Sequence, residues 1–274
     1  MFTRKQMAVG IGSLMVLLLL SSCFSLPGIG GFNPLGNLQA SISDRASAEV
    51  SSASGLTGMT RKMMFNIMYS QIFFIGGFGA DYYNLEETQG TVWRIETTDE
   101  DGQRSSVEAE RALLKTLPTG EQWWFLAWRA DGEVWEFEAL MGKDMMARKI
   151  RYFNEDVKRV EESKFDDPAK AKAGSETAPP PEASTSGLDP RDLPKYVEAK
   201  ETVKVRGGTF QTERIEWNFF DEEGKVNYHY IWWVDPKAPG GLVRFQWAQD
   251  GGKDSVQGEL VSLKKGYKTK FASY

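Results

Sequence analysis

The chain has one cysteine, Cys23, and one histidine, His229, among its 274 residues. A single thiol cannot form a disulfide within the chain, and it cannot supply a redox pair or a cysteine-rich zinc site. No Gly-x-Ser-x-Gly elbow occurs, and neither glycine pair, at 207–208 or at 240–241, is followed by the lysine of a phosphate-binding loop. These absences predict a non-enzymatic protein that uses no cofactor and whose fold is stabilised by packing alone.

The lone histidine offers no catalytic or metal-binding constellation. His229 lies in an alternating segment in which it shares one face with Asn227 and Ile231, and no His-x-x-Glu or Asp-x-Asp-x-Asp-Gly spacing accompanies it. A metal site would need carboxylates that converge from other strands. We therefore expect His229 to be a sheet-surface or hydrogen-bonded residue, and we predict no metal site.

Paired carboxylates could suggest glycoside hydrolysis, so the acidic strand residues need an interpretation. Glu136 and Glu138 alternate with Trp135 and Phe137, which places both carboxylates on the face opposite the aromatic rings. Charges on one face and aromatics on the other are typical of a half-buried strand. The pattern predicts that the carboxylates are solvated, and it predicts no catalytic residue.

Acidic residues outnumber basic ones, with 38 Asp and Glu against 33 Lys and Arg and a formal net charge of −5. The first 22 residues contain two basic residues and no acidic one, so the remainder of the chain is more acidic still. Because a phosphate backbone repels such a surface, we exclude nucleic acid as a main partner.

The N-terminus has the order of an export signal. Arg4 and Lys5 form a short cationic region, and residues 7–20 are largely apolar. Ser21 and Ser22 are small residues of the kind that a signal peptidase accepts.

The sequence Leu20-Ser21-Ser22-Cys23 resembles the lipobox of bacterial lipoproteins. The resemblance implies that residues 1–22 are a lipoprotein signal peptide and that Cys23 receives a diacylglycerol, with palmitate-type acyl chains, as the first residue after cleavage. An ordinary secretory signal and an uncleaved helix are the alternatives.

Two acyl chains hold a protein stably on a bilayer, whereas one chain gives only marginal binding. The predicted location is therefore the bacterial cell envelope, with the membrane as partner through the N-terminal diacylglycerol. Phe24 follows the cysteine where the inner-membrane retention signal of enterobacterial lipoproteins has Asp, so the resemblance favours the outer membrane, on either its periplasmic or its surface side.

Residues 23–57 are rich in Gly, Ser, Pro, Asn and Ala and show neither the helical nor the strand period. We predict a flexible tether here. Its r.m.s. reach would be about 30–35 Å, enough to hold a domain clear of the lipid headgroups. The folded domain is predicted to occupy residues 58–274.

Residues 59–75 follow a helical period. Residues 63–80 carry no charge, so a membrane-spanning helix is an alternative. Polar residues, glycines and the separate lipid anchor favour a helix that packs on a sheet. The predicted apolar side of that helix is formed by Met64, Ile67, Met68, Ile72 and Ile75.

After residue 83 the pattern changes to period two, as where Trp93 and Ile95 alternate with Arg94 and Glu96. Short glycine-containing turns separate such segments, and short turns join antiparallel neighbours. The pattern predicts a mainly β fold of ten or eleven strands. We expect an antiparallel curved sheet or half-barrel, connected as a meander, with one packed N-terminal α-helix.

Residues 163–192 interrupt the strand pattern with Ala, Lys, Glu, Ser and the run Pro179-Pro180-Pro181. This composition cannot bury enough apolar surface to order itself. We predict one β-rich domain with a disordered insertion at about 163–192. Two β subdomains, at 58–162 and 193–274, are the alternative.

Tryptophan is concentrated in a few strands, and a sheet with many indoles on one face must cover them, close around them or offer them to a ligand. If the 59–75 helix covers the tryptophans, they are ordinary residues of the hydrophobic core. A ligand surface is the alternative reading. Its candidate ligand-facing aromatics are Trp135, Phe137, Trp217, Phe219, Tyr228, Tyr230 and Trp232.

An N-terminal apolar helix followed by an antiparallel sheet resembles the LolA/LolB lipoprotein carriers, which hold acyl chains against a concave apolar face. The resemblance implies an apolar ligand or a lipidated partner on the concave sheet. A second hypothesis, from a different class, is a structural or assembly module of an envelope protein complex. An analogy of fold does not transfer activity, so both hypotheses stay open.

Overall fold

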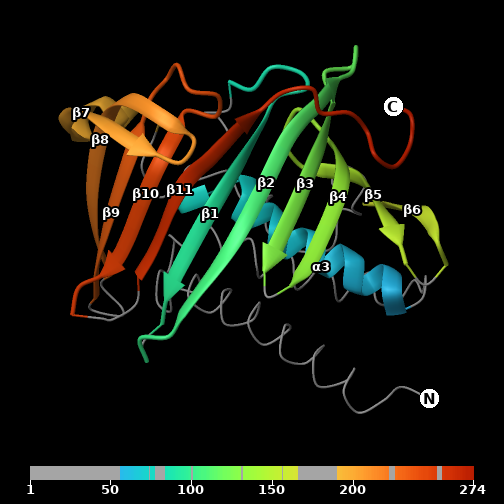
Figure 1. Cartoon of the computed structure of the whole chain (residues 1–274), viewed down its shortest axis with the longest axis horizontal. Coiled ribbons are helices and arrows are strands. Elements are labelled where there is room, and N and C mark those ends of the chain that lie inside the picture. Colours follow the sequence, from blue (N-terminus) through green and yellow to red (C-terminus); the bar gives the residue numbers. More distant parts are fainter. Residues whose placement is uncertain are drawn as a thin grey trace, which may run out of the picture.

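The computed structural model describes residues 56–73, 75–77, 84–99, 101–130, 132–155, 157–165, 190–221, 226–251 and 255–274. In these residues, eleven strands form one sheet, and a single α-helix, α3, crosses one of its faces (Figure 1). The helical elements are α3 (Leu56–Phe73) and the short 3-10 helices η2 (Ile75–Gly77) and η5 (Pro190–Tyr196). The strands are β1 (Gly90–Thr98), β2 (Arg104–Thr116), β3 (Gln122–Ala130), β4 (Glu133–Met141), β5 (Ala147–Asn154), β6 (Arg159–Lys164), β7 (Val197–Val205), β8 (Gly208–Asp221), β9 (Val226–Val234), β10 (Leu242–Gln249) and β11 (Ser255–Lys264).

The strand order is β6-β5-β4-β3-β2-β1-β11-β10-β9-β8-β7, and every neighbouring pair is antiparallel. The predicted mainly β, antiparallel sheet is confirmed. The order departs from a simple meander at one place, because β1 pairs with β11 and the two edges are therefore β6 and β7. The strands before and after residues 166–189 lie in the same sheet, while those residues themselves lie outside the described part of the chain.

We call the side of the sheet that packs on α3 the helix face. The helix begins at Leu56, three residues before the predicted start, and ends at Phe73, so the predicted Ile75 lies in η2. Of its predicted apolar side, Met64, Met68 and Ile72 are buried. Phe65 meets Phe137 of β4 edge-on, with ring centroids 5.7 Å apart. Each such buried side chain contributes about 1.5–3 kcal/mol to folding. Within the described residues, no helix is both long and apolar enough to cross a bilayer.

Strands β7–β11 curl back on themselves. Gly207, in the β7–β8 turn, donates its backbone N–H to the carbonyl oxygen of Leu260 in β11 at 2.9 Å, although β9 and β10 lie between β8 and β11. A Cβ on Gly207 would lie 3.0 Å from that oxygen, so the close approach favours glycine. The register between β1 and β11 also shifts here, leaving Val261 without a partner in β1. This closure gives the curvature predicted for a half-barrel.

The opposite side of the sheet, which we call the outer face, carries a second apolar cluster. This cluster is formed by Ala112, Leu114, Trp123, Phe125 and Ala127. The C-terminal segment, residues 265–274, crosses it, and the rings of Tyr267 and Phe125 lie 6.0 Å apart (Figure 1). Strand β3 is therefore buried on both faces, with Trp124 and Leu126 against the helix face.

The C-terminal segment also corrects one expectation about the outer face. The pattern of β4 predicts that Glu136 and Glu138 are solvated, but Glu138 is 0% exposed. A residue can be solvated only where nothing covers its strand, and residues 265–274 cover β4 at this point. The prediction is wrong for Glu138, whereas Glu136 keeps 27% of its side chain exposed.

Candidate functional site

The predicted lipid anchor lies outside the described residues. Cys23, the signal peptide 1–22 and nearly all of the tether 23–57 precede the first described residue, Leu56. Lipidation of Cys23 therefore stays a prediction from the sequence.

Two of the candidate aromatics lie on β4 and belong to the core. Phe137 is 0% exposed and packs between the helix and β5, with its ring 6.1 Å from that of Tyr152. Trp135 is half-buried, and the guanidinium of Arg61 in α3 lies 4.5 Å from its ring centroid. The helix thus covers this part of the helix face with both apolar and cationic groups.

Four further candidates gather on β8 and β9. Tyr230 lies between Trp217 and Trp232, with ring centroids 5.4 and 5.5 Å away. Trp247 of β10 joins them by stacking on Tyr228 at 5.7 Å. Sequence reasoning missed Trp247, although the period-two pattern of β10 places it on this face.

This aromatic cluster is largely enclosed. Tyr228 and Trp232 are buried, and Trp232 donates its indole N–H to the carbonyl oxygen of Gly76 in η2 at 2.6 Å. Trp217 and Tyr230 are half-buried. Burial raises the pKa of Tyr230 above its ordinary value, so its phenol is neutral at physiological pH.

The structure does not bring the seven candidates to one place. Five strands, β3, β2, β1, β11 and β10, separate β4 from β9. At about 4.8 Å per strand, the two groups are about 29 Å apart along the sheet. The side chain of Phe219 lies outside the described side chains. The ligand-facing role of these aromatics stays a prediction.

Two buried indole N–H groups on the helix face have no hydrogen-bond partner among the residues that the structure describes. They belong to Trp93 and Trp128, which are 1% and 2% exposed and flank Ala109 in the register of β1, β2 and β3. An unsatisfied buried donor costs about 1–3 kcal/mol. An acceptor held between the sheet and the helix would therefore be stabilised at this point.

On the outer face, Glu110 collects three donors. It accepts hydrogen bonds from Tyr267 and from Lys264 at 3.1 Å, and it forms an ion pair with Arg129 at 2.7 Å. Burial alone would raise the pKa of Glu110, but these three donors outweigh it and hold the pKa below its usual range. Burial and the neighbouring carboxylate raise the pKa of Tyr267, which therefore stays a neutral donor.

A second buried group centres on Glu138. Its carboxylate accepts hydrogen bonds from the Thr269 hydroxyl at 2.8 Å and from the backbone N–H of Lys270 at 2.6 Å. Arg151 lies beside it and donates to Glu162 at 2.8 Å and to the carbonyl oxygen of Ser273 at 2.9 Å. Both groups fasten the C-terminal segment to the sheet.

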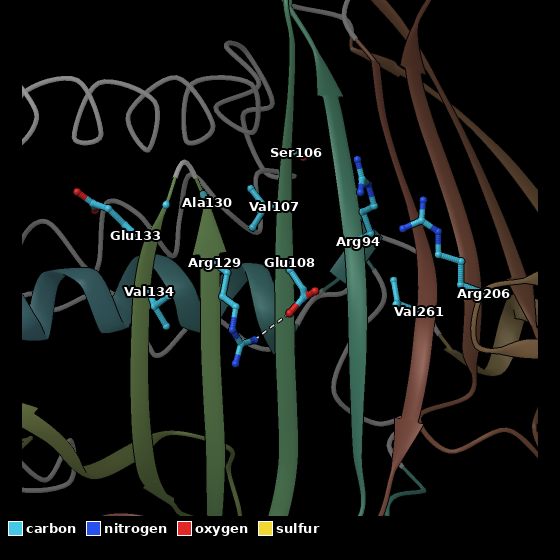
Figure 2. Close-up of a pocket in the computed structure, with 11 residues that line it drawn as sticks. Arg94, Ser106, Val107, Glu108, Arg129, Ala130, Glu133, Val134, Arg206 and Val261 are labelled. Carbon is cyan, nitrogen blue, oxygen red and sulfur yellow. Dashed lines mark hydrogen bonds and ion pairs between the residues drawn. The ribbon is translucent and has the colours of Figure 1, made fainter.

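A groove of about 330 Å³ lies across β11, β1, β2, β3 and β4 on the outer face (Figure 2). One cross-strand row places Glu259, Arg94, Glu108 and Arg129 of β11, β1, β2 and β3 directly opposite one another, and the last three of these residues line the groove. Arg206, from the β7–β8 turn, reaches the groove and pairs with Glu259 at 3.1 Å. Sequence reasoning did not identify this groove, because it combines five strands and a distant turn.

The histidine lies where the sequence places it. His229 is 37% exposed on the outer face of β9, and its Nε2 lies 3.4 Å from an oxygen of Glu216 on β8. This is a surface contact of the ordinary cross-strand kind.

No protein-family model matches the sequence, and the search of curated proteins gives no match. Solved structures with a similar arrangement include a candidate lipoprotein from Parabacteroides distasonis, 13% identical, which covers 67% of this chain and 98% of its own at a TM-score of 0.33. A chain of the Pseudomonas aeruginosa MucA/MucB complex is 12% identical, and the match covers 73% of this chain and 57% of that chain at a TM-score of 0.35. A LolA superfamily protein from Nitrosomonas europaea is 8% identical, and the match covers 74% of this chain and 92% of that chain at a TM-score of 0.25. At such identities and TM-scores, none of these likenesses assigns a family or a function to the chain.

Proposed function

We propose that this chain is a lipid-anchored, non-enzymatic protein of the bacterial cell envelope whose sheet serves as an assembly module for a protein complex. The sequence Leu20-Ser21-Ser22-Cys23 supports the anchor. The observation that supports assembly over lipid carriage is the filled helix face. There Phe65, Met68 and Ile72 occupy the concavity of the sheet that a carrier would offer to an acyl chain.

Metabolic labelling with a palmitate analogue tests the anchor. We expect the wild-type chain to carry the label and to fractionate with membranes, and Cys23→Ala to lose both properties. Ser22→Ala is the matched control, because it changes the neighbouring residue but keeps a small side chain and the cysteine. An unlabelled wild-type chain would overturn the anchor.

Site-specific cross-linking in intact cells tests assembly. A photo-reactive side chain at Arg104 or Val134, both exposed, should capture one defined envelope protein, and tagging that protein should capture this chain in return. A chain recovered only as a monomer from every position would reject the assembly role.

The second candidate function is binding of an apolar ligand or a lipidated partner. The unpartnered indole N–H groups of Trp93 and Trp128 favour it, because a ligand carbonyl between helix and sheet would satisfy them. Native mass spectrometry after gentle extraction should then show a bound lipid, which Trp128→Phe should weaken. No co-purifying lipid and no fatty-acyl binding would reject this candidate.

A further inference from the structure

We infer that the groove on the outer face is a binding site for a zwitterionic group, meaning an ammonium and an oxyanion held a few atoms apart. Arg94 and Arg206 bind the oxyanion and Glu108 binds the ammonium. The inference stands on the geometry of the groove and does not depend on lipidation of Cys23 or on a protein partner.

The groove exists because two opposite charges do not pair. Arg94 on β1 and Glu108 on β2 are directly opposite each other, at a position where Cβ atoms lie about 4.5–5.5 Å apart. Arg94 turns instead to Glu96 on its own strand, at 2.8 Å. Glu108 turns to Arg129 on β3, at 3.0 Å. Figure 2 shows the Arg94 side chain running along β1, away from the Glu108 carboxylate, whose dashed line joins Arg129, so the cation and the anion border one slot without pairing.

The side chains that border the slot have unused hydrogen-bonding atoms. Arg94 and Arg206 each bind their carboxylate through Nε, which leaves their terminal nitrogens without a hydrogen bond to any residue that the structure describes, and their side chains are 40% and 56% exposed. Glu108 binds Arg129 through one oxygen, and its side chain is 45% exposed. Two guanidinium groups match an oxyanion, and a carboxylate oxygen matches an ammonium N–H.

The balance of charge selects a zwitterion over a simple ion. Arg94, Arg129 and Arg206 line the groove together with Glu108 and Glu133. With the carboxylates of Glu96 and Glu259, which pair with Arg94 and Arg206, the count becomes three cations and four anions, so the formal charge of the groove is only −1. A ligand with net charge of either sign gains little from such a site, whereas a ligand with both charges matches both sides of the slot.

Two sources can supply this chemistry in a cell envelope: the phosphoethanolamine headgroup of a lipid, and an amino acid or short peptide with free termini. The probes are therefore alanine and the glycerol phosphodiesters of ethanolamine and choline, which we call phosphorylethanolamine and phosphorylcholine and which carry one negative charge each, as a lipid headgroup does. The quaternary ammonium of phosphorylcholine has no N–H to donate to Glu108. Acetate and methylamine are the single-charge controls.

The experiment is a titration of the full chain in detergent, followed by the shifts of backbone amide resonances. We expect saturable binding of phosphorylethanolamine or alanine, with phosphorylcholine about tenfold weaker. Arg94→Gln and Glu108→Gln should each weaken binding about tenfold. Arg159→Gln is the matched control, because Arg159 pairs with Glu161 two residues along β6 just as Arg94 pairs with Glu96.

The outcomes separate the sources and can overturn the inference. Preference for phosphorylethanolamine, with flotation on phosphatidylethanolamine vesicles that exceeds flotation on phosphatidylcholine vesicles, assigns a lipid headgroup. Preference for alanine, with equal flotation on the two kinds of vesicle, assigns an amino acid or short peptide. Binding of acetate or methylamine as tight as that of the zwitterions, or no saturation up to about 10 mM, would overturn it. Unchanged circular dichroism would show that the variants are folded.

Discussion

The two halves of the sheet differ in what covers their faces. In strands β1–β6, α3 packs on the helix face and residues 265–274 cover part of the outer face, while the groove across β1–β4 stays open. Strands β7–β11 curl until the β7–β8 turn reaches β11, and their outer face is covered by their own long side chains. There Arg244 lies 4.9 Å from the ring of Trp233, which donates its indole N–H to Glu201 at 2.6 Å.

The difference shows what a remote segment adds to a strand. In the first half, the outer face holds carboxylates that are removed from water, such as Glu138 at 0% exposure. In the second half, the equivalent carboxylate of Glu216 keeps 27% of its side chain exposed. Buried carboxylates contribute to stability only while their donors stay in place. The first half should therefore depend on the C-terminal segment far more than the second half depends on any single contact.

Removal of residues 266–274 gives the largest expected effect. It would expose Trp123 and Phe125 and would leave Glu138 without its two donors. We expect a loss of about 4–6 kcal/mol in the free energy of unfolding, since an unpaired buried carboxylate alone costs several kcal/mol. Urea unfolding measures this loss.

Removal of Tyr274 alone is the control for that truncation. Its side chain is 47% exposed, so the midpoint of unfolding should move by no more than about 0.5 kcal/mol. Equal midpoints for the long truncation and the wild-type chain would show that the segment does not hold the first half together.

A paired substitution, Glu138→Gln and Glu216→Gln, sharpens the comparison of the two halves. Glutamine at 138 has one acceptor oxygen for two donors, so its N–H₂ group faces one of the two donors. We therefore expect the free energy of unfolding to fall by about 2–3 kcal/mol. At 216, where the ion pair with Arg214 and the contact with His229 are partly exposed, we expect less than about 0.5 kcal/mol. Equal losses at both positions would contradict the difference in burial.

Much of the fold could be predicted because local periodicity records which face of an element is buried. The period of 3.6 correctly places Met64, Met68 and Ile72 on the packed side of α3, and the period of two correctly buries Trp93 and Ile95. These patterns hold because each element has one face in water and one face in the core.

The misses share a different physical cause. Glu138 contacts Thr269, 131 residues later, and the covering segment has no period that would indicate what it packs on. Turn chemistry indicates which sequential strands pair, but it contains nothing about the pairing of β1 with β11. The outer-face groove depends on the side to which Arg94 and Glu108 turn, which a sequence pattern does not record. The lipobox occupies only residues 20–23, so the sequence alone can indicate it. Lipidation of Cys23 stays a prediction.

The stability of the β1–β6 half at low pH depends on the buried carboxylate of Glu110, and acid titration tests this dependence. Its pKa is lowered in the folded state, so the hydrogen bonds from Tyr267, Lys264 and Arg129 contribute stability that is fully present above the unfolded pKa and is lost as pH falls below about 4.5. We expect Glu110→Gln to cost about 1–2 kcal/mol at neutral pH and to flatten the loss of stability between about pH 5 and pH 3. Urea unfolding at several pH values measures both changes, and an unchanged acid slope in the variant would assign the slope to other carboxylates.

His229→Ala should give the smallest effect, and it tests the claim that the outer face of the second half needs no covering segment. The imidazole is 37% exposed, and its Nε2 lies 3.4 Å from Glu216, a contact that contributes between about 0 and 1 kcal/mol at a surface. We expect a change of less than about 0.5 kcal/mol in the free energy of unfolding. Thermal unfolding followed by circular dichroism measures it, with Gln211→Ala on β8 as a matched control for an exposed strand position. A fall of several degrees for His229→Ala alone would mean that something packs on this face as residues 265–274 pack on the other half, and the contrast between the halves would then fail.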